Sequence, residues 1–143
     1  MSQNGDRLCW VEWQFPNKPR NTTRVCTALY DDKSMKIIPG SIERFVNNPE
    51  SDPQNCTLPM WTNDNSLLYI SDKTGFWNVW IARNENERTN LTPVNEDIGD
   101  PLWKKDNRNY NYSSIRDEIV VVRKGGKLEW NNIDGSDSKI VEY

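Results

Sequence analysis

The sequence predicts an all-β fold, and three observations support this prediction. Every segment with a clear apolar pattern has the length of a strand and is bounded by turn residues. Helical periodicity is not sustained anywhere over enough residues to compete. A short phrase occurs twice at a separation of 42 residues, as Pro59-x-Trp61-x-x-Asp64 and Pro101-x-Trp103-x-x-Asp106. Since one four-stranded propeller blade occupies about 40–50 residues, we expect a fragment of a β-propeller with about two and a half four-stranded antiparallel blades.

Residues 1–38 are predicted to form a partial blade. Its strands are expected at residues 7–14, 24–30 and 35–38. A connecting loop is predicted over residues 39–55, because three prolines occur there among Asn, Glu and Ser. Within this loop, Ser41 has the chemistry to cap a brief helix through Phe45 and Val46.

Residues 56–92 are predicted to form a complete blade. Its strands are expected at residues 57–61, 67–71, 76–82 and 88–92. Asp64 is expected to organise the turn after the first strand by accepting hydrogen bonds from backbone N–H groups. Asp72 opens the next turn and Gly75 supplies the positive φ that such a hairpin requires.

Residues 93–143 are predicted to form a further blade with an extra C-terminal strand. The expected strands are residues 101–104, 108–114, 117–123 and 127–133, followed by the additional strand at 138–142. Trp103 lies in the first of these segments, and Asp106 is expected to organise the turn after it. The Gly125-Gly126 pair is interpreted as a hairpin turn, because no helix follows it to form a phosphate site.

Two strands of the complete blade are apolar on both faces. In 67–71, Leu67 and Tyr69 alternate with Leu68 and Ile70, whereas a sheet with one wet face alternates apolar and polar residues. Such strands must be covered on both sides, as they are when blades stack around a channel. Packing between blades is therefore the preferred role of the repeated tryptophans, over a stacking platform for sugars or peptides. These residues are Trp61, Trp77, Trp80 and Trp103.

Composition excludes several functional classes. The net charge is −3, and the 18 Lys and Arg residues are scattered, whereas nucleic-acid binding needs a concentrated basic face. No apolar run approaches the ~20 residues of a membrane span, and residues 1–6 lack the core of a signal peptide. We therefore expect no nucleic-acid partner and no membrane insertion, and a cytoplasmic location. The three widely spaced cysteines and the carboxylate pairs of the turns predict no metal site and no cofactor.

The complete blade resembles the blade motif of the prolyl oligopeptidase family of serine peptidases, in particular its acylaminoacyl-peptidase-like and dipeptidyl-peptidase-like members. The matching positions are Pro59, Trp61, Asp64, Leu67, Ser71, Asp72, Gly75, Trp77, Asn78 and Trp80. A second stretch, residues 8–19 (LCWVEWQFPNKP), resembles a segment that lies one blade earlier in the family. The departures include Phe15 for His, Lys73 for Arg, and Asn63 and Asn65 for Pro and Gly.

The resemblance implies a seven- or eight-bladed propeller that covers an α/β-hydrolase domain and limits substrate size. This chain has no histidine and no G-x-S-x-G motif, so it lacks the proton-transferring imidazole and the nucleophile of a Ser-His-Asp triad. We therefore expect no catalytic residue here, and contact with peptide substrates only through a hydrolase domain that this sequence does not contain. The alternative is a stand-alone binding or scaffold protein that closes its ring by self-association.

Overall fold

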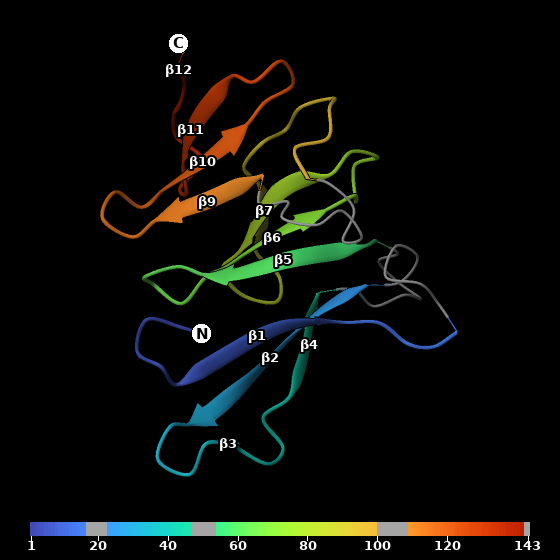
Figure 1. Cartoon of the computed structure of the whole chain (residues 1–143), viewed down its shortest axis with the longest axis vertical. Coiled ribbons are helices and arrows are strands. Elements are labelled where there is room, and N and C mark those ends of the chain that lie inside the picture. The colour runs from blue at the N-terminus through green and yellow to red at the C-terminus, as the bar shows by residue number, and fades with distance from the viewer. Residues whose placement is uncertain (17–22, 47–53, 100–108, 142–143) are drawn as a thin grey trace.

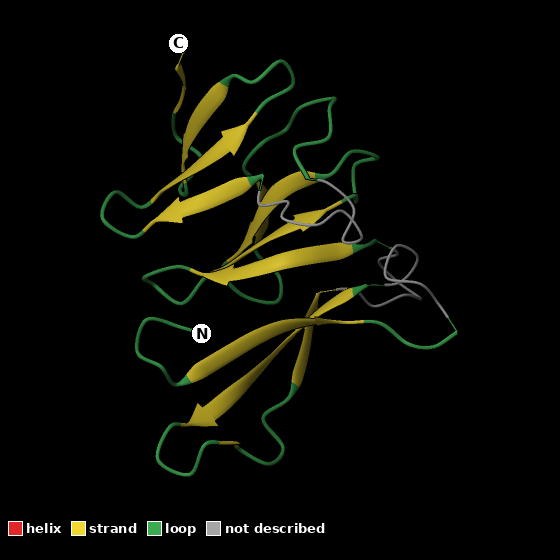
Figure 2. Cartoon of the chain, in the orientation of Figure 1, coloured by secondary structure: helices red, strands yellow, loops and turns green. Residues whose placement is uncertain are grey.

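The computed structural model describes residues 1–16, 23–46, 54–99 and 109–141. These residues form twelve strands in three antiparallel sheets, and the described part contains no helix (Figure 2). The sheets are stacked face to face in chain order, with β1–β4 at one end and β9–β12 at the other (Figure 1). The predicted all-β fold is therefore confirmed. Among the described residues, no segment forms a helix that could cross a membrane.

The first sheet is built around one long central strand. Its elements are β1 (Arg7–Glu12), β2 (Arg24–Asp31), β3 (Lys36–Ile37) and β4 (Glu43–Val46). One edge of β2 pairs with β1, and the other pairs with both β3 and β4. The prediction of a loop over 39–55 is thus wrong at β4, and so is the brief helix. The Ser41 hydroxyl accepts a hydrogen bond from Leu29 N at 3.0 Å and donates one to Ile38 O at 2.7 Å. These two hydrogen bonds hold the chain beside β2, so that β4 pairs with β2 after the interruption.

The middle sheet is a regular antiparallel meander. Its strands, in spatial and sequence order, are β5 (Cys56–Trp61), β6 (Leu67–Ser71), β7 (Asn78–Ala82) and β8 (Arg88–Asn90). The pairing of β5 with β6 is interrupted between Thr57 and Met60, where Leu58 has φ of 50°. The turn between β6 and β7 contains Gly75 at φ 89°, as a left-handed turn position requires.

The last sheet has four strands in the described residues. It consists of β9 (Tyr110–Ser113), β10 (Glu118–Val122), β11 (Leu128–Asn132) and β12 (Ser138–Val141). These four strands lie within the segments predicted at 108–114, 117–123, 127–133 and 138–142, whereas the strand predicted at 101–104 lies outside the described residues. The start of β7 and the start of β11 are 50 residues apart, and so are those of β8 and β12. The second copy of the 42-residue repeat lies outside the described residues.

Apolar clusters fill both spaces between the sheets. Leu67, Tyr69, Trp80 and Ala82 of the middle sheet pack toward Val25 of the first sheet. The alternate residues pack toward the last sheet, in a cluster of Leu68, Ile70, Val79, Ile81, Leu91, Ile98, Tyr110, Ile119 and Val121. The side chains of β6 and β7 are buried along both strands. The middle sheet is covered on both faces, as its double apolar pattern predicts.

Candidate functional site

The blade-motif residues occupy two kinds of position in the middle sheet. Trp61 and Trp80 belong to the cluster that faces the first sheet, whereas Trp77 packs against the cluster that faces the last sheet. Asp64 and Asp72 lie in turns, at the ends of β5 and β6. Trp103 and Asp106, predicted for the same roles in the following blade, lie outside the described residues.

Both motif aspartates act as hydrogen-bond acceptors inside the protein. Asp64 Oδ1 accepts from the Thr62 hydroxyl at 2.5 Å and from Ser66 N at 3.1 Å. Burial alone would raise the pKa of Asp64, but these hydrogen bonds outweigh it and lower the pKa. The Asp72 carboxylate accepts from Asn55 N at 2.6 Å and from Asn55 Nδ2 at 2.8 Å. Each carboxylate thus fixes local backbone geometry.

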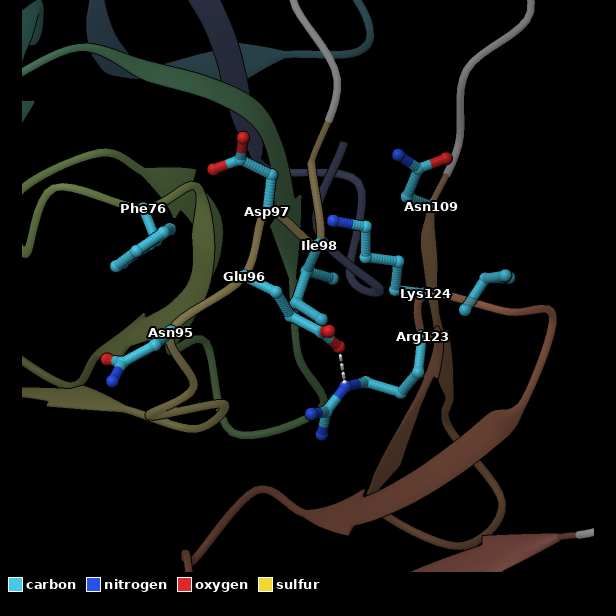
Figure 3. A pocket seen from close by; sticks show the side chains of 9 residues that line it. Phe76, Asn95, Glu96, Asp97, Ile98, Asn109, Arg123 and Lys124 are labelled. Atoms are coloured by element: carbon cyan, nitrogen blue, oxygen red, sulfur yellow. Dashed lines mark hydrogen bonds and ion pairs between the residues drawn. The ribbon is translucent and has the colours of Figure 1, made fainter.

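A cleft between the middle and last sheets has a volume of about 380 Å³. We call it the seam cleft. Figure 3 shows its side chains, among which are Phe76, Glu96, Asp97, Ile98, Arg123 and Lys124. The segment that follows β8 supplies one wall, because Ile98 N and Gly99 N both donate to Trp77 O, at 2.8 and 3.1 Å. Asp97 Oδ1 accepts from Trp77 N at 2.9 Å and ties the same segment to the start of β7.

Gly99 is required by the close packing of this wall. A Cβ atom at Gly99 would lie 2.7 Å from Ile70 Cγ2 and 2.9 Å from Ile70 Cδ1. Both distances are shorter than non-bonded carbon contacts of about 3.5–4.0 Å. The segment can therefore approach the middle sheet only with a glycine at this point.

Arg123 joins the two walls of the seam cleft by binding two carboxylates. Its Nε donates to Glu96 (Figure 3). Its Nη1 donates to Glu129 on the neighbouring strand β11. Burial would lower the pKa of Arg123, but the two carboxylates outweigh it and raise the pKa. The hydrogen bond from Arg123 is also the main reason that the pKa of Glu96 is lowered. The sequence places Glu96 and Asp97 in a solvated turn, so this network was missed.

The geometry of the seam cleft favours a structural role over acid–base chemistry. Glu96 is held ionised by Arg123, and an acid with a lowered pKa is a poor proton donor near neutral pH. Arg123 itself directs its donors at two protein carboxylates. The cleft therefore holds an ion-pair network that fixes the last sheet against the segment after β8.

A second set of polar contacts joins the turn after β5 to the hairpin between β9 and β10. The Tyr112 hydroxyl donates to Asp117 and accepts from Asn63 N at 3.1 Å. Asn63 Nδ2 donates to Ser114 O at 2.6 Å and to Asp117 Oδ1 at 3.1 Å. Asn63 replaces the proline of the family motif, and its side chain and N–H supply three contacts that proline has no atoms to make.

These contacts predict a pH effect for Tyr112→Phe. Burial and the hydrogen bond to Asp117 raise the pKa of Tyr112 to about 12. A raised acid pKa stabilises the folded state below its ordinary value of 10, and this contribution is lost as the pH rises toward 12. The stability advantage of the natural chain over Tyr112→Phe should therefore shrink between pH 10 and 12. Urea denaturation at several pH values measures it, and a constant difference would contradict the assignment.

No protein-family model and no curated protein matches the sequence. A solved puromycin hydrolase matches with a TM-score of 0.81 and 21% identity, over 100% of this chain and 21% of that one. A puromycin-hydrolyzing peptidase of Mycobacterium tuberculosis matches with a TM-score of 0.80 and 24% identity, over 99% of this chain and 21% of that one. A mutant puromycin hydrolase complexed with PGG gives a TM-score of 0.80, 20% identity and the same coverages of 99% and 21%.

These structures establish the fold of the chain. The chain spans about a fifth of the length of each solved structure that it matches, 21% in all three cases. The matched enzymes agree with the resemblance to prolyl oligopeptidase-type peptidases that the sequence displays. The chain has the fold of a β-propeller segment of the kind found in puromycin-hydrolysing enzymes.

Proposed function

We propose that this chain is a noncatalytic β-propeller module of a prolyl oligopeptidase-like serine peptidase, and that it contributes to the control of substrate access. The observation that carries the proposal is the fold match to two kinds of puromycin-hydrolysing enzyme over essentially the whole chain. The blade motif around Trp61 and Trp77 supports the same assignment. The absence of histidine from the sequence supports a noncatalytic role, since the serine triad requires an imidazole.

The outer face of the last sheet supports incorporation into a larger propeller. Pairing of β10 with β11 places Val120 opposite Trp130 and Val122 opposite Leu128, on the face away from the middle sheet. Pairing of β11 with β12 places Val141 beside Leu128, so Val122, Leu128 and Val141 form one row across the sheet. Val122 is 46% exposed and Val141 41% exposed, in rows that would be buried if another blade were stacked on them. A solvated outer face would carry polar residues at these positions.

An active-site probe and a size-graded set of substrates test this function. An antibody against the chain should isolate from the source cells a polypeptide or complex that a fluorophosphonate probe labels, whereas the 143-residue chain alone should remain unlabelled. The isolated species should hydrolyse dipeptide amides faster than longer peptides, because a propeller restricts access. Isolation of a 16.7 kDa species alone, without labelling, would favour the stand-alone binding protein. Labelling without dependence on peptide length would refute the role in access.

A further inference from the structure

A second cleft lies between the first and middle sheets and has a volume of about 180 Å³. We call it the Arg7 cleft. Its walls include Arg7 on β1, Glu43 on β4 and Trp61 at the end of β5. The volume equals that of about six water molecules at ~30 Å³ each. This limits an occupant to a small molecule or to the end of a larger one.

Arg7 presents a guanidinium group to this cleft. Its Cζ lies 5.9 Å from the centre of the Trp61 ring, within cation–π range. Among the described residues, no ion pair or side-chain hydrogen bond engages the guanidinium of Arg7. A stacked guanidinium is pre-organised for a bidentate contact with a carboxylate.

Glu43 supplies the opposite charge without pairing with Arg7. The strand pairing places Arg7 opposite Leu29, and Glu43 opposite Thr27, so all four residues share one face of the sheet. Strand β2 lies between β1 and β4, and the two charged residues pair with positions two residues apart on it. At about 4.8 Å per strand spacing and about 3.4 Å rise per residue, their backbones are about 12 Å apart. In the described part of the chain, no ion pair joins Arg7 to Glu43. The cleft therefore holds a cation and an anion on strands separated by β2.

Trp61 adds a buried donor. The residue is 8% exposed, and its Nε1 lacks a hydrogen-bond acceptor within the described structure. A buried N–H group without an acceptor is unfavourable by about 1–3 kcal/mol. Because this N–H is not accessible to solvent, other atoms of Trp61 line the cleft.

We propose that the Arg7 cleft binds small zwitterions that carry a carboxylate and an ammonium group on neighbouring carbons, as free α-amino acids with short side chains do. Arg7 binds the carboxylate, Glu43 binds the ammonium, and the Trp61 ring covers the carbon between them. A simple anion would leave Glu43 without a partner, and a simple cation would leave Arg7 without one. The proposal is independent of the function proposed above, since it concerns binding by this chain alone.

Binding of L-alanine to the whole chain, followed through the indole N–H signal of Trp61 in ¹H–¹⁵N spectra, tests the proposal. The signal is assigned by its loss in Trp61→Phe. We expect a saturable shift with L-alanine, and at least ~10-fold weaker binding of acetate and methylammonium. Arg7→Gln and Glu43→Gln should each weaken L-alanine binding at least ~10-fold, as expected for the loss of one charge-assisted contact.

Arg116→Gln is the matched control. Arg116 also lies 5.9 Å from a tryptophan ring, that of Trp130, but it does not line the Arg7 cleft. This variant should bind L-alanine as the natural chain does. The proposal is overturned if L-alanine gives no saturable shift, if acetate binds as tightly as L-alanine, or if Arg7→Gln behaves like Arg116→Gln.

Discussion

Replacement of Arg123 by alanine is expected to lower the free energy of unfolding by about 3 kcal/mol, at the lower end of the ~3–5 kcal/mol found when one partner of a buried ion pair is removed. The reason is the position of Glu129, whose side chain is only 8% exposed. Without Arg123, this carboxylate stays buried with no cation beside it. Denaturant titration, analysed by linear extrapolation, measures the change.

Arg116→Ala provides the control for this prediction. The Arg116 side chain is 67% exposed, and it lies 3.7 Å from a carboxylate oxygen of Glu118. Exposed pairs of this kind contribute about 0–1 kcal/mol, so Arg116→Ala should have little effect. Equal losses of stability in Arg123→Ala and Arg116→Ala would show that the Arg123 network does not fix the last sheet against the segment after β8.

The effect of Arg123→Ala should also depend on pH. The pKa of Glu96 is lowered from its ordinary value of 4.5, chiefly by the hydrogen bond from Arg123. A carboxylate with a lowered pKa stabilises the folded state above its ordinary pKa, and this contribution is lost as the pH falls through the lowered value. The stability difference between the natural chain and Arg123→Ala should therefore decrease below about pH 4.5.

The fold was predictable wherever local chemistry and alternation agreed. In 67–71, Leu67 and Leu68 point to opposite faces and both are buried, so period-two alternation identified a doubly covered strand. The turn at Gly75 was predictable for the same reason, since its positive φ is a local requirement. The repeated tryptophan phrase was a weaker guide. Its three matched residues gave a spacing of 42, whereas β7 and β11, and likewise β8 and β12, start 50 residues apart.

The features that were missed depend on partners distant in the sequence. Strand β4 is short and lies between Pro39 and Pro49 in the sequence, and it forms because Ser41 bonds to β2, twelve residues away. Arg123 and Glu96 are 27 residues apart, and no local pattern marks them as partners. The charges of the Arg7 cleft likewise come from two strands separated by a third. Local propensity predicts the strands, but it does not predict which side chains meet between sheets.

Leu67→Ala and Leu68→Ala should each lower the free energy of unfolding by about 2–5 kcal/mol, the usual range for a leucine removed from a core. The two residues are adjacent, both are fully buried, and they belong to different clusters. In a sheet with one solvent-exposed face, only one of two adjacent leucines lies in a core. Comparable losses at both positions would require packing on both faces, and denaturant titration measures them.

Leu29→Ala is the matched control, because the same atoms are removed from a residue that is 39% exposed. It should lower the free energy of unfolding by less than about 1 kcal/mol, since only part of the side chain is transferred from water on folding. If Leu67→Ala or Leu68→Ala has no greater effect than Leu29→Ala, one face of the middle sheet is not a core. If both have the larger effect with one shared transition, the three sheets unfold together, because the middle sheet is then the common wall of both clusters.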